Sequence, residues 1–375
     1  MKAWLFQDHR QKQELGDEAP WYVGWYEPDG KKRRKKIGSH SMAVKFSRKV
    51  EGQLAAGVYQ SNARKTWKEF EAEFKEKIAA SMKPQSKRLT LESMAHFKRI
   101  AKPGRVETIK TQTMDAFIAK RRVERGLKKG STISPATVNK DLRHLKAVLN
   151  VAHEWGYLAR VPKFRMLKEP TKLPRFITPE HFAKIYKECD KATMPEGLPY
   201  PAGDWWKALL VFCYMTGWRV GEPLALRRED LDLVNGTAIT RASDNKGGRD
   251  EVAPLHDVVV EHLRSIPSFS ALVFPWPHER KKLWEQFGDI QRAAGIKLDC
   301  NEQHECTPSC HVYGFHDLRR AFATQNAARL PATTLQALMR HKAFATTQRY
   351  INMVRQVDEA VGSLHVPDVL AKSGG

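Results

Sequence analysis

The amino-acid sequence predicts a mainly α-helical protein with small β elements, divided into three structured parts. Apolar residues recur at the three- and four-residue spacing of amphipathic helices through most of the chain, whereas alternating patterns occur only in short stretches. Prolines mixed with cations interrupt the helical pattern at residues 161–176. The 375 residues are also enough for two or three domains of roughly 100 to 200 residues each.

Residues 1–60 predict a β-hairpin followed by a helix. Aromatic and small residues alternate from Trp21 to Trp25, and Pro28-Asp29-Gly30 is typical of a tight turn. Apolar residues at helical spacing then predict the helix: Ala43, Phe46, Val50 and Leu54. The six consecutive cations of residues 31–36 begin the second strand, so we expect them to contact phosphate groups rather than form a flexible tail.

Residues 63–160 predict a compact bundle of about four helices. Three apolar stripes carry this prediction: Trp67, Phe70, Phe74 and Ile78; Met114, Phe117 and Ile118; and Val138, Leu142, Leu145, Val148 and Leu149. We expect these stripes to form the core. The basic segment of residues 161–176 predicts an interdomain linker, because its prolines cannot continue a helix.

Residues 177–365 predict a third, mostly helical part, followed by a tail at residues 366–375. Thr178 is expected to cap the first helix, with Pro179 in its first turn. One β-patterned interruption, from about residue 231 to residue 255, predicts a small sheet.

Positive charge is concentrated in the first half of the chain. The whole sequence has a net charge of +22 and a pI near 9.8. Residues 1–174 contain 39 basic and 18 acidic side chains, and residues 175–375 contain 25 and 24, so the two parts carry +21 and +1. An excess confined to one part favours binding to an anionic polymer over general solubility.

The sequence argues against a membrane or secreted protein. Its longest apolar run, Ala208 to Met215, is shorter than the roughly 18 residues of a membrane span, and residues 1–10 lack a signal-peptide core. Five cysteines, an odd number, fit reduced thiols or a metal site better than a disulfide framework. We therefore expect a cytoplasmic protein.

Short motifs in the third part contain residues suited to phosphate chemistry. Arg219 follows an apolar helix that Gly217 is expected to end, and its planar fork could bind a phosphate or pair with Glu222. His316 and Arg319 have the i, i+3 spacing that places both on one helical face, near the helix N-terminus.

A tyrosine completes the set. Tyr350 follows His341 by nine residues, and Thr346 or Thr347 could cap the helix that carries it. The order of these residues resembles the tyrosine recombinases, also called phage-type integrases. The resemblance implies an arm-type DNA-binding module at residues 1–60, a helical core-binding (SAM-like) domain at 63–160 and a catalytic domain at 177–365.

The resemblance also implies a role for each matching residue. Arg219 would be the first catalytic arginine, His316 and Arg319 the His-x-x-Arg pair, His341 the second histidine and Tyr350 the nucleophile. Lys246, in a glycine-containing turn, matches the family's mobile lysine. There are two departures from the family pattern: Arg340 stands where Gly is common, and Pro223 where the helix is usually unbroken.

These residue types suit DNA strand cleavage through a covalent 3′-phosphotyrosine. Two arginines and a histidine can stabilise the charge that a phosphodiester gains during attack. A phenol needs a base or a cationic field to react, for which His316 and the arginines are the candidates, and Lys246 could protonate the leaving 5′ oxygen. The sequence has no P-loop or acidic cluster suited to paired Mg²⁺, so we expect catalysis without cofactor, metal or ATP.

Cysteines and histidines cluster just before the predicted His316 helix: Cys300, His304, Cys306, Cys310 and His311. They could supply four tetrahedral zinc ligands, but the cluster lacks paired Cys-x-x-Cys knuckles. A structural zinc ion and reduced thiols in a surface insertion both remain as interpretations. A bound metal would stiffen the insertion and take no part in phosphoryl transfer.

The expected function is a site-specific DNA recombinase or integrase of a mobile element, and the resemblance implies a homotetramer on two DNA duplexes. One alternative is a type IB topoisomerase-like enzyme, against which the arm-like module argues. Another is a non-catalytic DNA-binding protein, which would not require Tyr350. Apolar residues after Tyr350 would pack on a neighbouring subunit or on their own domain: Val354, Val357, Val361 and Leu364.

Salt titrations test the charge partition. Duplex binding by the full chain should weaken steeply with salt, because each neutralised phosphate contributes about −0.9 to the slope of log K against log salt. A fragment of residues 175–375 should bind weakly with a much shallower slope, and deletion of residues 1–60 should give intermediate affinity. Equal slopes for the full chain and the fragment would show that the basic half is not the main DNA contact.

Overall fold

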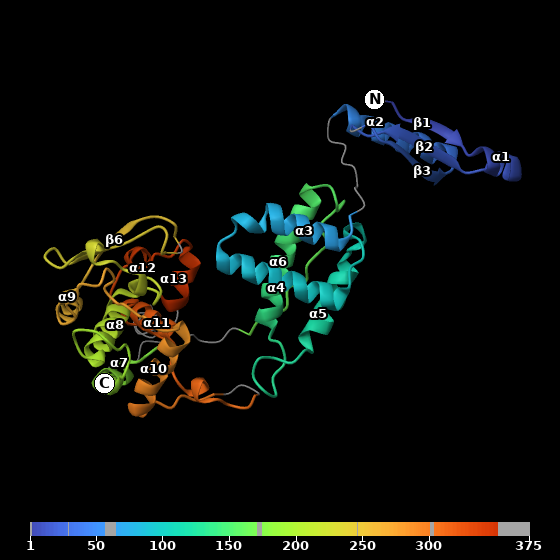
Figure 1. Cartoon of the computed structure of the whole chain (residues 1–375). Helices are drawn as coiled ribbons and strands as arrows, with labels where there is room; N and C mark the ends of the chain where they lie inside the picture. Colours follow the sequence, from blue (N-terminus) through green and yellow to red (C-terminus); the bar gives the residue numbers. More distant parts are fainter. Residues whose placement is uncertain are drawn as a thin grey trace, which may run out of the picture. The chain divides into compact units, whose positions relative to one another are not determined.

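The computed structural model describes residues 2–28, 30–56, 65–170, 175–245, 247–300 and 304–351. It divides into two compact units, Met1–Pro170 and Thr171–Gly375 (Figure 1). Most elements are helices, accompanied by two three-stranded antiparallel sheets, which confirms the predicted fold class. Within the described residues, no helix is long and apolar enough to cross a membrane.

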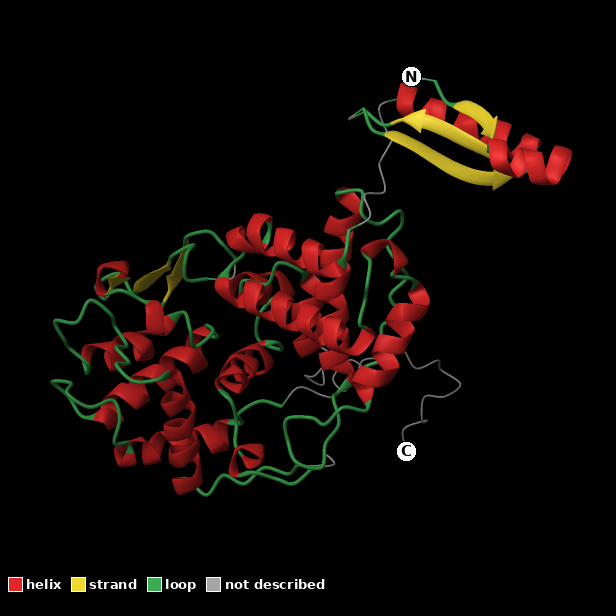
Figure 2. Ribbon diagram, turned by 45° about the vertical axis from the view of Figure 1, so that its right-hand side comes forward, coloured by secondary structure: helices red, strands yellow, loops and turns green. Residues whose placement is uncertain are grey.

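The N-terminal module of the first unit is an antiparallel sheet in the order β1-β2-β3, with helix α2 along one face (Figure 2). Its elements are β1 (Trp4–Gln7), α1 (His9–Leu15), β2 (Trp21–Tyr26), β3 (Lys32–Gly38) and α2 (His40–Ala55). Val23 of β2 and Ala43 of α2 are fully buried in the core between sheet and helix. The cations of residues 32–36 lie on β3 and are exposed.

Strand β1 is an element that the sequence patterns did not predict. Its four residues, Trp-Leu-Phe-Gln, do not alternate between apolar and polar, so the strand depends on its contacts with β2. The Trp4 ring covers Gly24, where an added Cβ atom would lie 2.5 Å from the ring. The absence of a side chain at Gly24 therefore allows β1 to pair there.

The four predicted helices of the bundle are present. They are α3 (Trp67–Lys77), α4 (Pro84–Ala101), α5 (Thr111–Arg122) and α6 (Pro135–Glu154). Thr66 caps α3 reciprocally with Glu69, each side chain accepting a hydrogen bond from the other's backbone N–H. The predicted apolar stripes form one core, in which Phe70, Phe117 and Leu145 are fully buried.

A buried ion pair lies inside this bundle. Asp141 of α6 has no exposed surface and accepts hydrogen bonds from Arg121 Nε at 3.0 Å and Ser93 Oγ at 2.9 Å. Arg121 also pairs with Glu124. The pair links α4, α5 and α6, because each of these helices contributes one of the partners.

The chain that leaves α6 stays against the bundle through residue 170. Phe164 and Leu167 pack on its core, and the Asn139 side chain bonds the backbone of Leu167 through both its amide nitrogen and its oxygen. Residues 161–170, the first ten residues of the predicted linker, are therefore held against the bundle.

The second unit is built around helix α8 (Ala202–Thr216), which is apolar on nearly all sides. Trp205, Trp206, Leu209 and Phe212 of this helix are fully buried. The surrounding helices are α7 (Pro179–Lys187), α9 (Asp257–Arg264), α10 (Arg280–Ala293) and α11 (Phe315–Asn326). As predicted, Thr178 caps α7, its hydroxyl accepting a hydrogen bond from His181 N–H at 3.3 Å.

Two further features complete the second unit. The predicted small sheet has the order β4-β5-β6, formed by β4 (Leu231–Asp232), β5 (Thr237–Thr240) and β6 (Glu251–Pro254). Helices α12 (Ala332–Met339) and α13 (Phe344–Ile351) pack with the end of α11 in a separate small core. The segment after residue 351, including the apolar positions from Val354 to Leu364, lies outside the described residues.

Replacement of Asp141 tests the buried ion pair. Asp141→Ala should lower the free energy of unfolding by about 3–5 kcal/mol, because it leaves the Arg121 charge buried with a partner missing. Glu92→Ala is the control, since it removes an exposed pair with Arg88 and should cost less than about 1 kcal/mol. Urea unfolding followed by circular dichroism measures both. Equal losses for the two variants would contradict the assignment.

Candidate functional site

Arg219 lies in a tight turn directly after α8. Gly217 ends the helix in the left-handed conformation, with a φ of 65°, as the sequence predicted. The Arg219 backbone N–H donates to Glu222 Oε2 at 2.9 Å, and its Nη1 lies 3.2 Å from Glu222 Oε1. The pair with Glu222, one of the two interpretations of Arg219, is therefore formed, while the Arg219 side chain remains 36% exposed.

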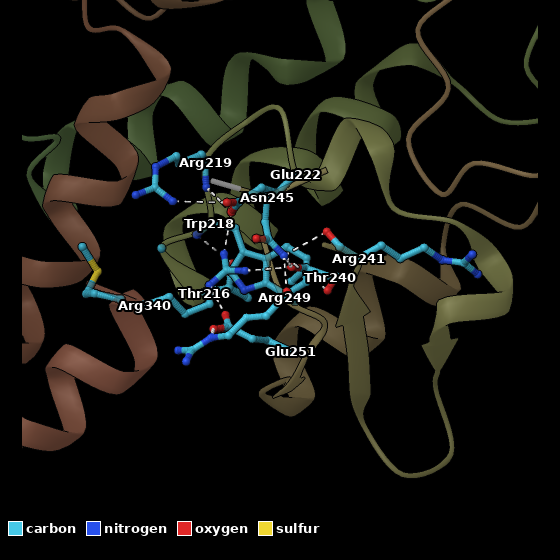
Figure 3. A network of polar contacts seen from close by, with 12 residues as sticks. Thr216, Trp218, Arg219, Glu222, Thr240, Arg241, Asn245, Arg249, Glu251 and Arg340 are labelled. Atoms are coloured by element: carbon cyan, nitrogen blue, oxygen red, sulfur yellow. Dashed lines mark hydrogen bonds and ion pairs between the residues drawn. The ribbon is translucent and has the colours of Figure 1, made fainter. Parts of the chain in front are cut away.

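Glu222 is the centre of a polar network that sequence analysis did not identify (Figure 3). Its carboxylate is buried and also accepts a hydrogen bond from Arg340 Nη2 at 2.5 Å. The Arg340 guanidinium lies over the Trp218 ring, 4.6 Å from its centroid, and donates to Thr240 Oγ1 at 3.1 Å. Arg340 thus fixes the turn of Arg219 against β5.

The backbone of Arg340 has a conformation that glycine adopts most easily. Arg340 caps α12 in the left-handed conformation, with a φ of 51°, which is unfavourable for any residue with a Cβ atom. The contacts of its guanidinium with Glu222 and Trp218 offset that cost. The departure noted in the sequence therefore adds a side chain to the site without changing the helix end.

Arg319 is the most deeply buried cation of the site. It is 1% exposed, and it donates from Nη1 to the Gly217 carbonyl at 2.6 Å and from Nη2 to the Met339 carbonyl. Burial, together with the nearby Arg219 charge, lowers the pKa of Arg319 to about 10. The side chain remains a cation at neutral pH and connects the ends of α8 and α12.

His316 lies one turn before Arg319 on α11, in the first turn of the helix as predicted. Burial lowers its pKa, and the charges of Arg320 and Arg319 lower it further. His316 is therefore neutral at pH 7 and able to accept a proton.

His341 and Tyr350 lie against each other. Their rings are nearly parallel, with centroids 6.0 Å apart, and Tyr350 is 7% exposed. His341 Nδ1 lies 2.9 Å from Thr347 Oγ1. Burial and the charges of Arg319 and Arg219 lower the pKa of His341 to about 4, so its imidazole is also neutral.

The expected role of the threonines was wrong. Helix α13 begins at Phe344, so Thr346 and Thr347 lie inside the helix and do not cap it. Thr347 is fully buried and orients His341 instead. Sequence spacing could not distinguish these roles, because a threonine near a helix start can bond either the backbone or a neighbouring side chain.

Lys246 lies outside the described residues, whereas its neighbours Asn245 and Gly247 are described. Asn245 is buried and donates to Thr240 Oγ1 at 2.8 Å and to the Arg249 carbonyl at 2.7 Å, while its oxygen accepts from Gly248 N–H. The Asn245 side chain therefore holds the turn between β5 and β6 closed. The position of Asn245 near two glycines in the sequence is the signal that could have identified this role.

A cavity of about 270 Å³ opens where these elements meet. Its lining includes Arg219, Arg249, Arg340, His341 and Lys342. Arg319 and His316 lie close enough to Arg219 and His341 for their charges to alter one another's pKa values. The site therefore combines several cations, two neutral imidazoles and a nearby phenol, which suits binding and attack of a phosphate diester.

Four of the five cysteine-cluster residues come together in the loop before α11. The ligand atoms of Cys300, His304, Cys306 and Cys310 all lie within 4.8 Å of one another. His311 faces elsewhere, with its Nδ1 2.7 Å from the Leu298 carbonyl oxygen.

Residues 175–356 match the model of the phage integrase family. A Sinorhizobium fredii protein named as an integrase/recombinase, y4qK, is 27% identical over 195 residues, which cover 50% of this chain and 54% of the relative. Tyrosine recombinase XerD of Staphylococcus epidermidis is 28% identical over 160 residues, covering 39% and 50%. The chain thus spans about half the length of these two curated relatives.

Solved structures share the fold. A lambda integrase dimer bound to a COC′ core site aligns with a TM-score of 0.57 and 17% identity, covering 92% of this chain and 94% of that one. The Tn1549 transposon integrase in complex with transposon right end DNA aligns with a TM-score of 0.61 and 16% identity, covering 80% and 98%. The family match spans every described residue of the cationic site, so residues 175–356, the part of the chain that carries this site, belong to the phage integrase family.

Proposed function

We propose that this protein is a site-specific DNA recombinase or integrase that cleaves and rejoins strands through a covalent 3′-phosphotyrosine, without metal or ATP in the chemical steps. One observation carries the proposal: two arginines, two histidines and a tyrosine, far apart in the sequence, meet beside one cationic cavity in the part of the chain that belongs to the phage integrase family.

The arginines are proposed to bind the scissile phosphate. Arg219 is partly exposed at the cavity, and its Glu222 contact leaves guanidinium N–H groups for phosphate oxygens. Arg319 adds positive charge from a buried position, where electrostatic interactions are stronger than in water. Both would stabilise the extra negative charge of the pentacovalent transition state.

We assign the proton transfers to His316, which is neutral, and to Lys246, which is a cation. His316, neutral at pH 7, is proposed to accept the Tyr350 proton as the phenol oxygen attacks phosphorus and the bond to the 5′ oxygen breaks. Lys246, on the turn that Asn245 closes, is proposed to protonate that leaving oxygen. His341, held by Thr347, would donate a hydrogen bond to the phosphate.

The rest of the chain is proposed to hold the DNA. The protein is proposed to act in the cytoplasm. We assign residues 1–60 to an arm-type module, 63–160 to a core-binding domain and 177–365 to the catalytic domain, with a linker at 161–176 and a tail at 366–375. We further propose assembly as a homotetramer on two duplexes, supported by the fold shared with a lambda integrase tetramer bound to a Holliday junction.

Removal of one hydroxyl tests the nucleophile. Tyr350→Phe should keep duplex affinity, because a single hydroxyl is lost from a large interface, yet abolish the covalent protein–DNA adduct on a nicked substrate. Thr346→Ala, on the same helix, is the control and should still form the adduct. An adduct of normal yield in Tyr350→Phe would rule out the assignment. Strand joining between two sites would then distinguish a recombinase from a topoisomerase.

Conservative replacement tests the phosphate contacts. Arg219→Lys and Arg319→Lys should each slow cleavage by two orders of magnitude or more, on the order of 3 kcal/mol, because a point charge reproduces neither the fork that Arg219 offers to a phosphate nor the two carbonyl contacts that hold the Arg319 charge in place. Arg227→Lys, at an exposed pair with Glu229, is the control and should cleave normally. Single-turnover cleavage at saturating DNA measures all three. Near-normal rates in both site variants would show that neither arginine contacts the reacting phosphate.

A further inference from the structure

We propose that Cys300, His304, Cys306 and Cys310 bind one structural zinc ion in the loop between α10 and α11. Their ligand atoms lie within 4.8 Å of one another. Cys310 belongs to a short 3-10 turn, whereas Cys300, His304 and Cys306 lie in neither a helix nor a strand. Three thiols and one imidazole form a common ligand set of structural zinc sites. The site lies outside the cationic cavity, whose lining includes none of the four residues.

The distances from the imidazole nitrogen to the three sulfurs fit a tetrahedral ion. Zn–S bonds of about 2.3 Å and a Zn–N bond of about 2.0 Å place the nitrogen about 3.5 Å from each sulfur. His304 Nε2 lies 3.3 Å from Cys310 Sγ, 3.6 Å from Cys300 Sγ and 3.8 Å from Cys306 Sγ. The imidazole nitrogen thus faces all three sulfurs at the edge lengths of one coordination tetrahedron.

One backbone donor is placed to stabilise a thiolate at Cys310. The Thr307 backbone N–H points at Cys310 Sγ, 3.3 Å away, where it would donate to a negatively charged sulfur. Three thiolates so close together repel one another unless a cation lies between them. A divalent cation at the centre of the four donors removes that repulsion.

The sequence of the loop offers little apolar surface to bury. Residues 299–311 include no large apolar side chain, so hydrophobic burial contributes little to its stability. The neck of the loop is closed by two contacts: Leu298 N–H donates to the His311 carbonyl at 2.8 Å, and His311 Nδ1 lies 2.7 Å from the Leu298 carbonyl oxygen. This contact also explains why His311 is not the imidazole ligand.

The ion would order the chain that leads into α11. Four protein ligands fill a tetrahedral shell and leave no position for substrate, so the role is structural. Beyond Cys310, Val312 accepts a hydrogen bond from Arg175 at 3.0 Å, and Tyr313 exchanges two hydrogen bonds with the buried Gln291 side chain. His316 follows three residues later, so the proposed site anchors the segment that positions this histidine.

Metal analysis of the full-length protein tests the proposal without DNA. Protein purified after growth with zinc should contain about one equivalent, and the metal-free protein titrated with Co²⁺ should show the thiolate charge-transfer and visible bands of a tetrahedral site. Cys306→Ser and His304→Ala should weaken binding at least about ten-fold, whereas His304→Cys should retain the metal in a four-cysteine site. Ser309→Ala, within the same loop, is the control and should bind like the parent.

Three results would overturn the proposal. Metal-free protein that gives no tetrahedral Co²⁺ spectrum would show that the cluster consists of reduced thiols or contains a disulfide. Equal zinc affinity of His304→Ala and the parent, measured by competition with a chelator, would show that the ion binds elsewhere. Chelation should also increase hydrogen exchange in residues 298–316 but not in α9, and unchanged exchange in that segment would rule out the structural role.

Discussion

The active-site region depends on the buried guanidinium of Arg319. A buried charge must be compensated by hydrogen bonds, and Arg319 obtains them from the carbonyls of Gly217 and Met339, at the C-terminal ends of α8 and α12. These helix ends carry partial negative charge, which suits a cation. Arg219 lies two residues after Gly217, and His341 two residues after Met339. One side chain therefore fixes the starting points of both segments that face the cavity.

In the absence of a bound anion the arginines of the site repel one another, and the Glu222 carboxylate offsets this repulsion. Its buried carboxylate contacts Arg219 and Arg340, while Trp218 covers the second guanidinium. Because Glu222 engages only part of each guanidinium, the arginines are oriented but their charges still exceed that of the carboxylate. Such an arrangement is organised before an anion arrives, which is the condition for strong transition-state stabilisation.

The sequence was sufficient for features that depend on local chemistry. Thr178 caps a helix and Gly217 ends one because the residue types favour these conformations whatever surrounds them. The Arg340 bridge to Glu222 spans 118 positions, and no local pattern predicts such a partner. Strand β1 likewise depends on a tertiary contact with Gly24. In the cysteine cluster, spacing could not decide which histidine faces the sulfurs, since that depends on the neck formed by Leu298 and His311.

The two units differ in where their important cations lie. The cations of β3 are exposed, where charge is well solvated and adds long-range attraction for a polyanion at little cost in stability. In the second unit the important cations are buried or half-buried, and each requires a specific acceptor: a carbonyl for Arg319, a carboxylate for Arg219 and Arg340. Buried arginines of this kind need acidic partners. Residues 175–375 accordingly contain nearly equal numbers of basic and acidic side chains, 25 and 24. A nearly neutral domain can still present a cationic cavity, because the basic side chains of the lining (Arg219, Arg249, Arg340 and Lys342) outnumber its two carboxylates, Glu222 and Glu251, and Arg219 stays 36% exposed.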